Sequence, residues 1–258
     1  MLGGFFLAVA LTIAAGVVYA YTALRPEPLA ADTGCPLSGP TSVTVVLVDD
    51  SDVIAPRQQA FLRNQLEEIK AGIPAGGALR VFSMGAASGD LLQPVATVCN
   101  PGRPEDASGL TSSVKRVART YREVFDEPLQ KLFDGLLATG TTKHSRIFEA
   151  IQSVGITTFS DPQFKDRPRR LVIVSDLLHY SPEFSHYSAP GDFDAFSGMP
   201  YYRQVRTNLR DVEVSVLYLR RETKAGIQGP RHLSFWRDML LDQGALPPSG
   251  TFFKQVEG

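Results

Sequence analysis

The chain has 258 residues and a formal net charge of −1, from 26 basic and 27 acidic side chains. Such an even balance offers no basic surface, and this excludes the protein classes that bind nucleic acid or an anionic surface through charge. The roughly 220 residues that follow the N-terminal segment are enough for one domain with a sizeable core.

The chain begins with an apolar segment. Residues 1–24 contain no charged side chain and are rich in Leu, Ala, Val, Ile and Phe. About 20 apolar residues cross a bilayer core, so the segment predicts a transmembrane anchor. The small residues around Val18 to Ala20 are also compatible with a signal-peptide cleavage site, although no Lys or Arg precedes them. Residues 25–41, with several Pro, Gly and Ser, predict a linker to a domain at 42–258.

The remaining elements are predicted from hydrophobic periodicity. In chain order they are a strand at 43–48, a helix at 58–71, strands at 79–84 and 93–98, a helix at 110–136, a helix from 145, strands at 170–174 and 211–219, and a helix at 232–243. Pro94 suits an edge strand, and Pro128 should kink or divide its helix. Strands that alternate with helices indicate an α/β fold with a mainly parallel sheet covered on both faces.

Two predicted strands end in acidic residues. Asp49-Asp50-Ser51-Asp52 follows the first strand, and Ser175-Asp176 follows the strand at 170–174. In open α/β sheets ligands bind at the carboxyl ends of the strands, and hard cations such as Mg²⁺ prefer carboxylate and hydroxyl oxygens. The spacing therefore predicts a divalent-metal site. The alternative is that Asp50, Ser51 and Asp52 cap the helix that follows.

These motifs resemble a von Willebrand factor A domain, over residues 42–258. The resemblance implies a doubly wound, Rossmann-like sheet and a metal-ion-dependent adhesion site, built from Asp-x-Ser-x-Ser, a threonine of a second loop and a later aspartate. The residues that match are Asp49, Ser51, Ser145 in the place of the threonine, and Asp176, with Thr142 as the alternative to Ser145. Val53 occupies the last motif position and has no side-chain oxygen, for which Asp50 or Asp52 could compensate. The implied ion is Mg²⁺ or Mn²⁺.

The resemblance also implies a function. In this family an open coordination position on the ion accepts a carboxylate from a partner protein. We therefore expect a membrane-tethered protein-interaction module on the periplasmic or extracellular side of a bacterial envelope. We expect no enzymatic activity, no small-molecule substrate and no nucleic-acid partner. The alternative is a structural or scaffolding subunit with a vestigial metal site.

The two cysteines are Cys35 and Cys99. An even pair in an exported domain predicts one disulfide, and two unrelated buried thiols are the alternative. In a doubly wound arrangement the edge strand ending at Cys99 runs antiparallel to its neighbour. This brings Cys99 to the side of the sheet where the first strand begins, just after Cys35. Neither cysteine has the spacing of a zinc ligand.

A long segment with many aromatic residues, at 178–202, follows the second acidic strand end. Loops of this length in compact domains are often functional, and exposed aromatic side chains are good partner anchors. The predicted partner contacts are His179, Tyr180, Phe184 and Tyr187. The alternative is a loop folded on its own hydrophobic side chains.

An enzymatic interpretation rests on Asp50-Ser-Asp52, which resembles the Asp-x-Asp motif of haloacid-dehalogenase-like phosphatases. The resemblance would make Asp50 the nucleophile and Asp52 the acid/base, with Ser175 at the second motif. The Gly-Thr expected after the second aspartate is absent, and Asp176 has no acidic neighbour in sequence at its strand end.

Overall fold

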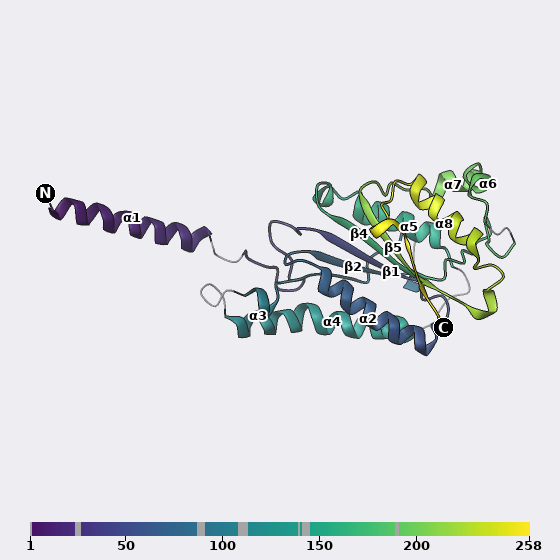
Figure 1. The fold of residues 1–258 in the computed structure, drawn as a ribbon, viewed down its shortest axis with the longest axis horizontal. Coiled ribbons are helices and arrows are strands. Elements are labelled where there is room, and N and C mark those ends of the chain that lie inside the picture. The colour runs from purple at the N-terminus through teal and green to yellow at the C-terminus, as the bar shows by residue number, and fades with distance from the viewer. Residues whose placement is uncertain are drawn as a thin grey trace.

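The computed structural model describes residues 2–23, 27–86, 91–107, 113–138, 140, 145–188 and 191–258. The N-terminal segment forms helix α1 (Leu2–Ala23), which lies apart from the α/β domain (Figure 1). Among the described residues, no helix combines the length and the apolar character needed to cross a bilayer. The predicted transmembrane span is therefore not confirmed.

The domain is built around a sheet whose strands are β1 (Val43–Val48), β2 (Ala78–Ser83), β3 (Ala96–Cys99), β4 (Arg169–Ser175), β5 (Val212–Leu219) and β6 (Phe253–Val256). Within the described residues these form one six-stranded sheet in the order β3-β2-β1-β4-β5-β6. Strand β3 is antiparallel to β2, and the other neighbours are parallel. The strand order thus reverses at β1, between β2 and β4.

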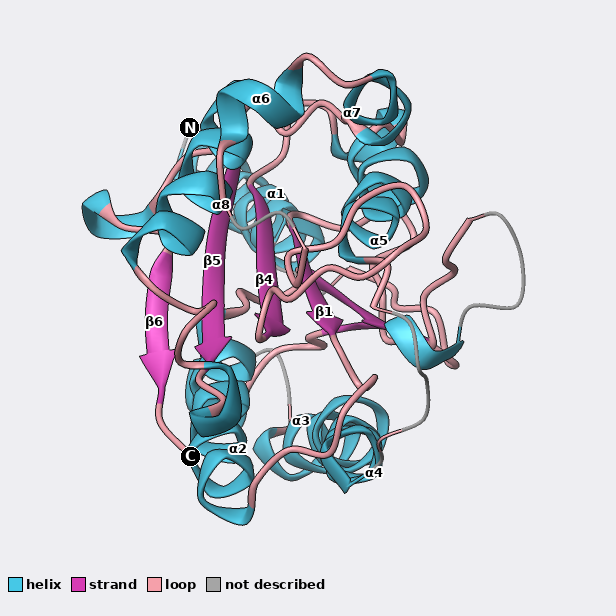
Figure 2. Cartoon of the chain, turned by 90° about the vertical axis from the view of Figure 1, so that its right-hand side faces the viewer, coloured by secondary structure: helices cyan, strands magenta, loops and turns pink. Residues whose placement is uncertain are grey.

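Helices cover both faces of the sheet (Figure 2). One face carries α2 (Pro56–Gly72), α3 (Val114–Thr120) and α4 (Glu127–Ala138), and the other carries α5 (Ile147–Val154), α6 (Phe193–Ser197), α7 (Pro200–Val205) and α8 (Pro230–Asp242). Alternate residues of β1 enter opposite cores: Val46 and Val48 pack with α2 and α4, and Val45 and Leu47 with α5 and α8. The predicted α/β class, a mainly parallel sheet flanked by helices, is confirmed.

A π-helical turn interrupts the predicted helix that contains Pro128. Helices α3 and α4 are joined by a π-helical turn at Tyr121–Asp126, directly before Pro128. A proline has no N–H, and its ring clashes with the carbonyl of the residue four positions earlier. The wider turn accommodates this clash, and it divides the predicted helix into α3 and α4. Lys70 of α2 is buried and binds Asp126 in this turn, with 2.7 Å between the ammonium and carboxylate groups.

The predicted disulfide is present and joins Cys35 to Cys99. Cys99 lies opposite Ala78, the first residue of β2, because β3 and β2 are antiparallel. The Cys99 amide also donates to the carbonyl of Thr33, at 2.8 Å. The bond therefore ties the chain before β1 to the edge strand at the end of the sheet where β1 begins.

Three regions of the chain differ from the sequence prediction. Strand β3 begins at Ala96, not at residue 93, because Pro94 has no N–H for the ladder and the first cross-strand bond comes from the Val95 amide. Segment 178–202 contains the short helix α6 and the start of α7. Strand β6 was not predicted, since it is four residues long and half of it is exposed.

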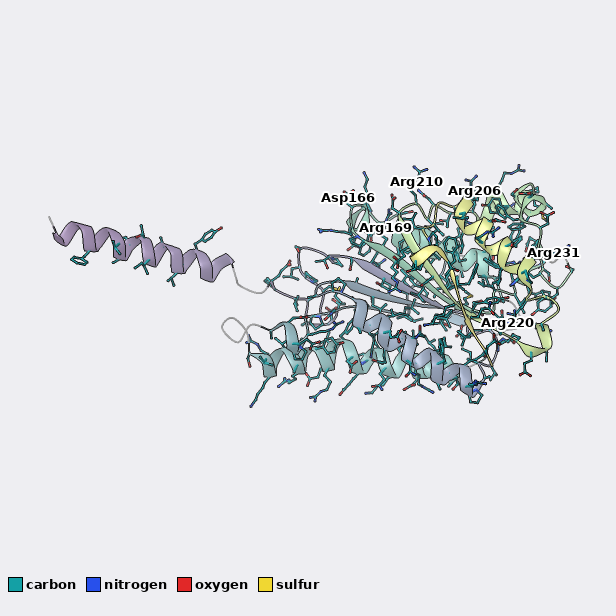
Figure 3. The ribbon with its side chains drawn as sticks, in the orientation of Figure 1. Asp166, Arg169, Arg206, Arg210, Arg220 and Arg231 are labelled. Atoms are coloured by element: carbon teal, nitrogen blue, oxygen red, sulfur yellow. A yellow bond between two sulfur atoms is a disulfide. The ribbon has the colours of Figure 1, made fainter. Side chains whose placement is uncertain are left out.

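Arginine side chains make polar contacts where β4 and β5 begin: Nη2 of Arg169 donates to the carbonyl of Arg210 at 2.9 Å, and both residues are labelled in Figure 3. Arg169 lies 3.7 Å from the Asp211 carboxylate, and Arg170 lies 3.4 Å from that of Glu213. These ion pairs hold the first residues of β4 beside those of β5. They lie at the end of the sheet opposite to the acidic residues that follow β1 and β4.

Candidate functional site

Strands β1 and β4 deliver the candidate site at their carboxyl ends. The parallel register pairs Val48 with Val174, and the Asp49 amide donates to the carbonyl of Val174 at 2.8 Å. The residues that follow, Asp49 and Asp176, are 3% and 5% exposed. Two carboxylates therefore occupy one buried site, as the parallel pairing of their strands predicts.

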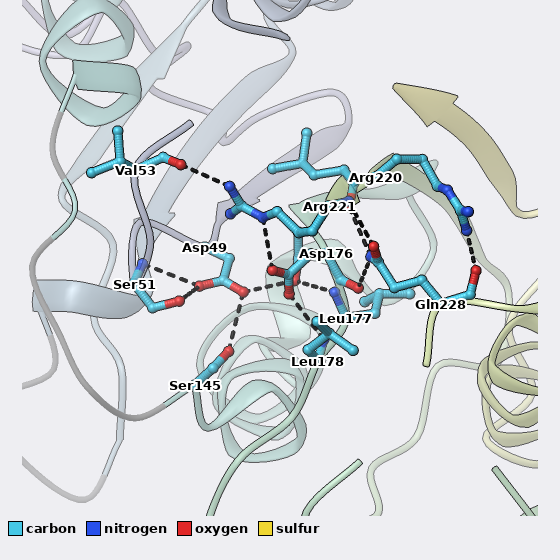
Figure 4. Close-up of polar contacts among 12 residues, drawn as sticks. Asp49, Ser51, Val53, Ser145, Asp176, Leu177, Leu178, Arg220, Arg221 and Gln228 are labelled. Carbon is cyan, nitrogen blue, oxygen red and sulfur yellow. Dashed lines mark hydrogen bonds and ion pairs between the residues drawn. The ribbon is translucent and has the colours of Figure 1, made fainter. Parts of the chain in front are cut away.

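Asp49 is the centre of a hydroxyl cluster (Figure 4). Its Oδ1 accepts from the hydroxyl of Ser51 at 2.6 Å and from the Ser51 amide at 3.2 Å. Its Oδ2 accepts from the hydroxyls of Ser145 at 3.1 Å and Ser175 at 2.7 Å. Each hydroxyl donates its proton to Asp49 and keeps lone pairs for another partner. The structure therefore brings together Asp49, Ser51 and Ser145, and it adds Ser175, which the metal-site prediction had omitted.

Asp176 is bound to an arginine that the sequence analysis did not identify. Its Oδ2 accepts from Nε of Arg221 at 3.0 Å, and its Oδ1 accepts from the Leu178 amide at 3.0 Å. Burial and the neighbouring Asp49 carboxylate raise the pKa of Asp176 to about 6, while Arg221 acts in the opposite direction. Arg221 lies just after β5, so three strand ends contribute charged groups to this site.

The chain turns sharply after Asp176. Leu177 adopts a φ of +58°, a left-handed conformation that is rare for a leucine. Its carbonyl lies 3.0 Å from both the Nε1 of Trp236 and the Nε2 of His232, two buried residues of α8. These two contacts hold the unusual backbone conformation and so fix the direction in which Asp176 leaves the strand.

Val53 contributes its backbone to the site. Its carbonyl accepts a hydrogen bond from Nη1 of Arg221 at 2.7 Å, and its side chain is 69% exposed. A Cβ on Gly140 would lie 2.7 Å from the Val53 amide nitrogen, so the two backbones are closely packed. The third motif position therefore binds the guanidinium through its carbonyl, where the resemblance expected a hydroxyl ligand.

Helix capping does not explain the acidic residues after β1. Asp50 is buried and accepts from the Ser83 hydroxyl at 2.7 Å and from the Gly85 amide at 2.6 Å. Asp52 is exposed. Helix α2 begins at Pro56 after Ala55, which has no capping side chain. The capping alternative is therefore wrong, because Asp50 binds the end of β2 instead.

His179 and Phe184 are buried, which corrects their assignment as partner contacts. Nδ1 of His179 accepts from the Ile147 amide at 3.1 Å, at the start of α5. Burial lowers the pKa of His179 to about 3, so the ring is neutral. Its Nε2 lies 3.2 Å from the hydroxyl of Tyr201, which donates to Glu149 at 2.7 Å. His179 thus fixes the start of α5, two residues after Ser145.

Two tyrosines are exposed beside the buried carboxylates. Tyr180 is 44% exposed and Tyr187 is 43% exposed, and their rings meet edge to face with 6.0 Å between centroids. We call these two residues the tyrosine rim. The Tyr180 amide donates to the Ser145 carbonyl at 2.9 Å, which anchors the rim to the hydroxyl cluster. Burial and the charges of Asp176 and Asp52 raise the pKa of Tyr187, consistent with its place next to these acids.

The oxygen donors suit a hard cation, since Asp49 and the serine hydroxyls are groups that Mg²⁺ and Mn²⁺ prefer. Among the described side chains, however, no three His, Cys, Asp or Glu residues are grouped to hold a metal ion. The Arg221 guanidinium already supplies a positive charge at Asp176. Thr142, the alternative ligand, lies outside the described residues.

No family model and no curated protein matches the chain. Among solved structures, it is similar to the conserved hypothetical protein BatB from Bacteroides thetaiotaomicron, with 11% identity over 84% of this chain and 91% of that one, at a TM-score of 0.36. It is also similar to an aerotolerance-related membrane protein from Bacteroides fragilis, with 10% identity over 80% and 90% of the two chains, at a TM-score of 0.35. At these TM-scores the likenesses carry no weight for the site.

Proposed function

We propose that the chain is a protein-interaction module that binds a partner at the carboxyl-end edge of its sheet. The observation that carries the proposal is the convergence of Asp49, three serine hydroxyls and Asp176 beside the exposed tyrosine rim. The cluster lies where the strand order reverses, which is the usual ligand position in open α/β sheets. Exposed tyrosines next to such a position are typical anchors of an interface.

The resemblance to a von Willebrand factor A domain supports the same proposal. In that family the matching residues bind a divalent ion, and here Ser51 and Ser145 contact Asp49 directly. We propose Mg²⁺ or Mn²⁺ as the ion, held by Asp49, Asp176 and these two hydroxyls. When bound, such an ion would supply a coordination position for a carboxylate of the partner protein.

We further propose that the domain lies outside the cytoplasm, next to a membrane. The uncharged N-terminal residues 1–24 and the Cys35–Cys99 disulfide support this placement. Disulfides persist in oxidising compartments and are rare in the cytosol. The tether would hold the interaction surface close to partners at the membrane surface.

We favour a binding function over phosphatase activity. The supporting observation is the environment of Asp50, the residue that would be the nucleophile. It is buried and both of its oxygens accept hydrogen bonds, from Ser83 and Gly85. A nucleophile must be reached by its substrate, and Asp50 is 4% exposed. We therefore expect no Mg²⁺-dependent hydrolysis of a generic aryl phosphate.

The scaffold alternative is favoured by one observation, the pairing of Asp176 with Arg221. An aspartate paired in this way needs no metal ion to balance its charge. The two functions differ in which surface carries the interaction. An interaction module requires the tyrosine rim, whereas a scaffold could use any other face.

The proposal is tested by pull-down of the full-length chain from detergent-solubilised envelope. Tyr187→Ala and Tyr180→Ala should each reduce partner recovery about tenfold or more, as expected when an interface anchor is truncated. The matched control is Leu246→Ala, because Leu246 is also exposed but lies beside the start of β5. Equal recovery by all four proteins would contradict the proposal.

A further inference from the structure

Arg221 occupies the position that decides the charge balance of the candidate site. Its Nε donates to the Asp176 carboxylate at 3.0 Å, and its Nη1 donates to the Val53 carbonyl at 2.7 Å (Figure 4). Both side chains of the ion pair are largely buried, at 17% and 6% exposure. One guanidinium thus connects the segments that follow β5, β4 and β1.

The electrostatics of the site require a cation. Asp49 and Asp176 are like charges in one buried site, and their repulsion is strong where water is excluded. A divalent ion would relieve this repulsion, and the guanidinium relieves it as well. Because both cations are attracted to Asp176 and repel each other, the presence of one weakens the binding of the other.

The backbone of Val53 helps to hold the Arg221 guanidinium in the site. A metal site of the adhesion type uses a hydroxyl at this motif position, and valine has none. The Val53 carbonyl instead receives the second hydrogen bond of Arg221. The missing ligand and the added cation are therefore two parts of one arrangement, in which the guanidinium bridges the two segments that a metal ion would otherwise join.

Arg221 is held in this position by a buried glutamine. The Arg221 amide donates to Oε1 of Gln228 at 2.7 Å. Nε2 of Gln228 donates to the carbonyl of Asp176 at 3.0 Å and to that of Leu219 at 2.9 Å. Gln228 is fully buried, so it fixes the backbone of Arg221 against that of Asp176 (Figure 4). These backbone contacts consequently place the guanidinium beside Asp176 in the folded chain.

We propose that Arg221 is a built-in competitor of the divalent ion. With the guanidinium on Asp176 and Val53, the charge of Asp176 is balanced without a metal. A divalent ion binds well only after Arg221 releases Asp176. This inference rests on the proposed function, because it concerns the regulation of the same site.

The test is a titration of the purified full-length chain in detergent with Mn²⁺, followed by the electron paramagnetic resonance signal of the free ion. Arg221→Gln should tighten the Kd for Mn²⁺ by about tenfold or more relative to the parent, because one repelling charge is removed. Lys224→Gln is the matched control. It removes the same charge three residues later, where the ammonium lies over the Tyr187 ring, 4.9 Å from its centroid. It should change the Kd less than about threefold.

Asp176→Asn in the Arg221→Gln background should abolish the gain. Equal Kd values for the parent and Arg221→Gln, or an equal gain in Lys224→Gln, would overturn the inference. Arg221→Met, which keeps an unbranched apolar stem without the charge, replaces Arg221→Gln if the latter does not fold. The pull-down with tyrosine-rim variants is a separate readout. Its failure would remove the interaction function and leave the result of the Mn²⁺ titration intact.

Discussion

Asp49 organises the candidate site at the scale of single residues. Its two oxygens accept hydrogen bonds from three serine hydroxyls and one amide, which follow or end β1 and β4 or lie two residues before α5. A buried carboxylate with this many donors is well satisfied. The donors depend on it in turn, because each hydroxyl would be left without its acceptor if Asp49 were removed.

Asp49→Ala should therefore lower the free energy of unfolding by about 2–4 kcal/mol in the presence of EDTA, because buried donors lose their acceptor. The loss exceeds the relief of repulsion at Asp176. The control is Asp52→Ala, in the same loop but exposed, for which we expect a change within about 0.5 kcal/mol. Guanidinium unfolding of the full-length chain measures both. Equal stabilities of the two variants would contradict the assigned role of Asp49.

Three buried histidines make stability depend on pH. Burial lowers the pKa of His179 to about 3 and that of His232 to about 4, and it lowers the pKa of His186 well below its usual range. Both ring nitrogens of His186 lack a hydrogen-bond partner in the described structure. Its ring contacts those of His232 and Trp236, at centroid distances of 4.7 and 5.6 Å.

Below pH ~6.5 these histidines bind protons in the unfolded chain but stay neutral in the folded chain. The free energy of unfolding therefore falls as the pH falls toward 4. Each such proton is worth about 1.4 kcal/mol per pH unit. The raised pKa of Asp176 acts with the opposite sign between about pH 4 and 6. In His186→Phe, the free energy of unfolding should fall less steeply with falling pH, because one fewer histidine binds a proton on unfolding. Guanidinium unfolding at pH 7.5, 6 and 5 measures this slope. An unchanged slope would show that His186 is not held neutral.

The sequence predicts part of this site, for a physical reason. Asp49 and Asp176 meet because parallel strands deliver their carboxyl ends to one edge, and this follows from the strand pattern alone. Arg221 was missed, although it follows the predicted strand at 211–219, since no local pattern shows which way a side chain after a strand points. The burial of His179 likewise depends on α5, which is distant in sequence.

At the scale of elements, the long apolar strands were predicted closely and the short ones were not. Strand β1 has the predicted bounds because its Val-rich run is buried on both faces. Strand β6 and helices α6 and α7 were missed, since each has eight residues or fewer and too little periodicity to be recognised. Such elements are stabilised by tertiary packing more than by their own sequence.

The end of α5 depends on a close backbone approach. Gly155 begins a π-helical turn, and a Cβ at this position would lie 2.1 Å from the hydroxyl oxygen of Thr207. Gly155→Ala should therefore destabilise the fold by about 1–3 kcal/mol, despite the better helix propensity of alanine. Adding Thr207→Ala should recover more than half of this loss. Differential scanning calorimetry of the parent, the two single variants and the double variant measures these changes in stability.

Gly135→Ala in α4 is the matched control, because a Cβ there meets nothing within 4 Å. It should leave stability unchanged or raise it by up to about 1 kcal/mol. If Gly155→Ala were as stable as Gly135→Ala, the close contact with Thr207 would not exist in solution.

At the scale of the whole molecule, the sheet separates two ends with different roles. The strand starts are held by the disulfide and by the ion pairs of Arg169 and Arg170. The carboxyl ends carry the hydroxyl cluster, Arg221 and the tyrosine rim. An interaction module on an α/β sheet requires strand starts that are held in place and carboxyl ends that are polar and partly exposed.

Site-specific photo-crosslinking tests this account most directly. A benzophenone side chain replaces Tyr187 in one full-length protein and Ile156 in another, expressed in the native cells. Ile156 is also exposed but follows α5, at the far end from Ser145. The account predicts a covalent adduct with a partner protein from position 187 and none from position 156. Adducts from position 156 with none from position 187 would contradict it.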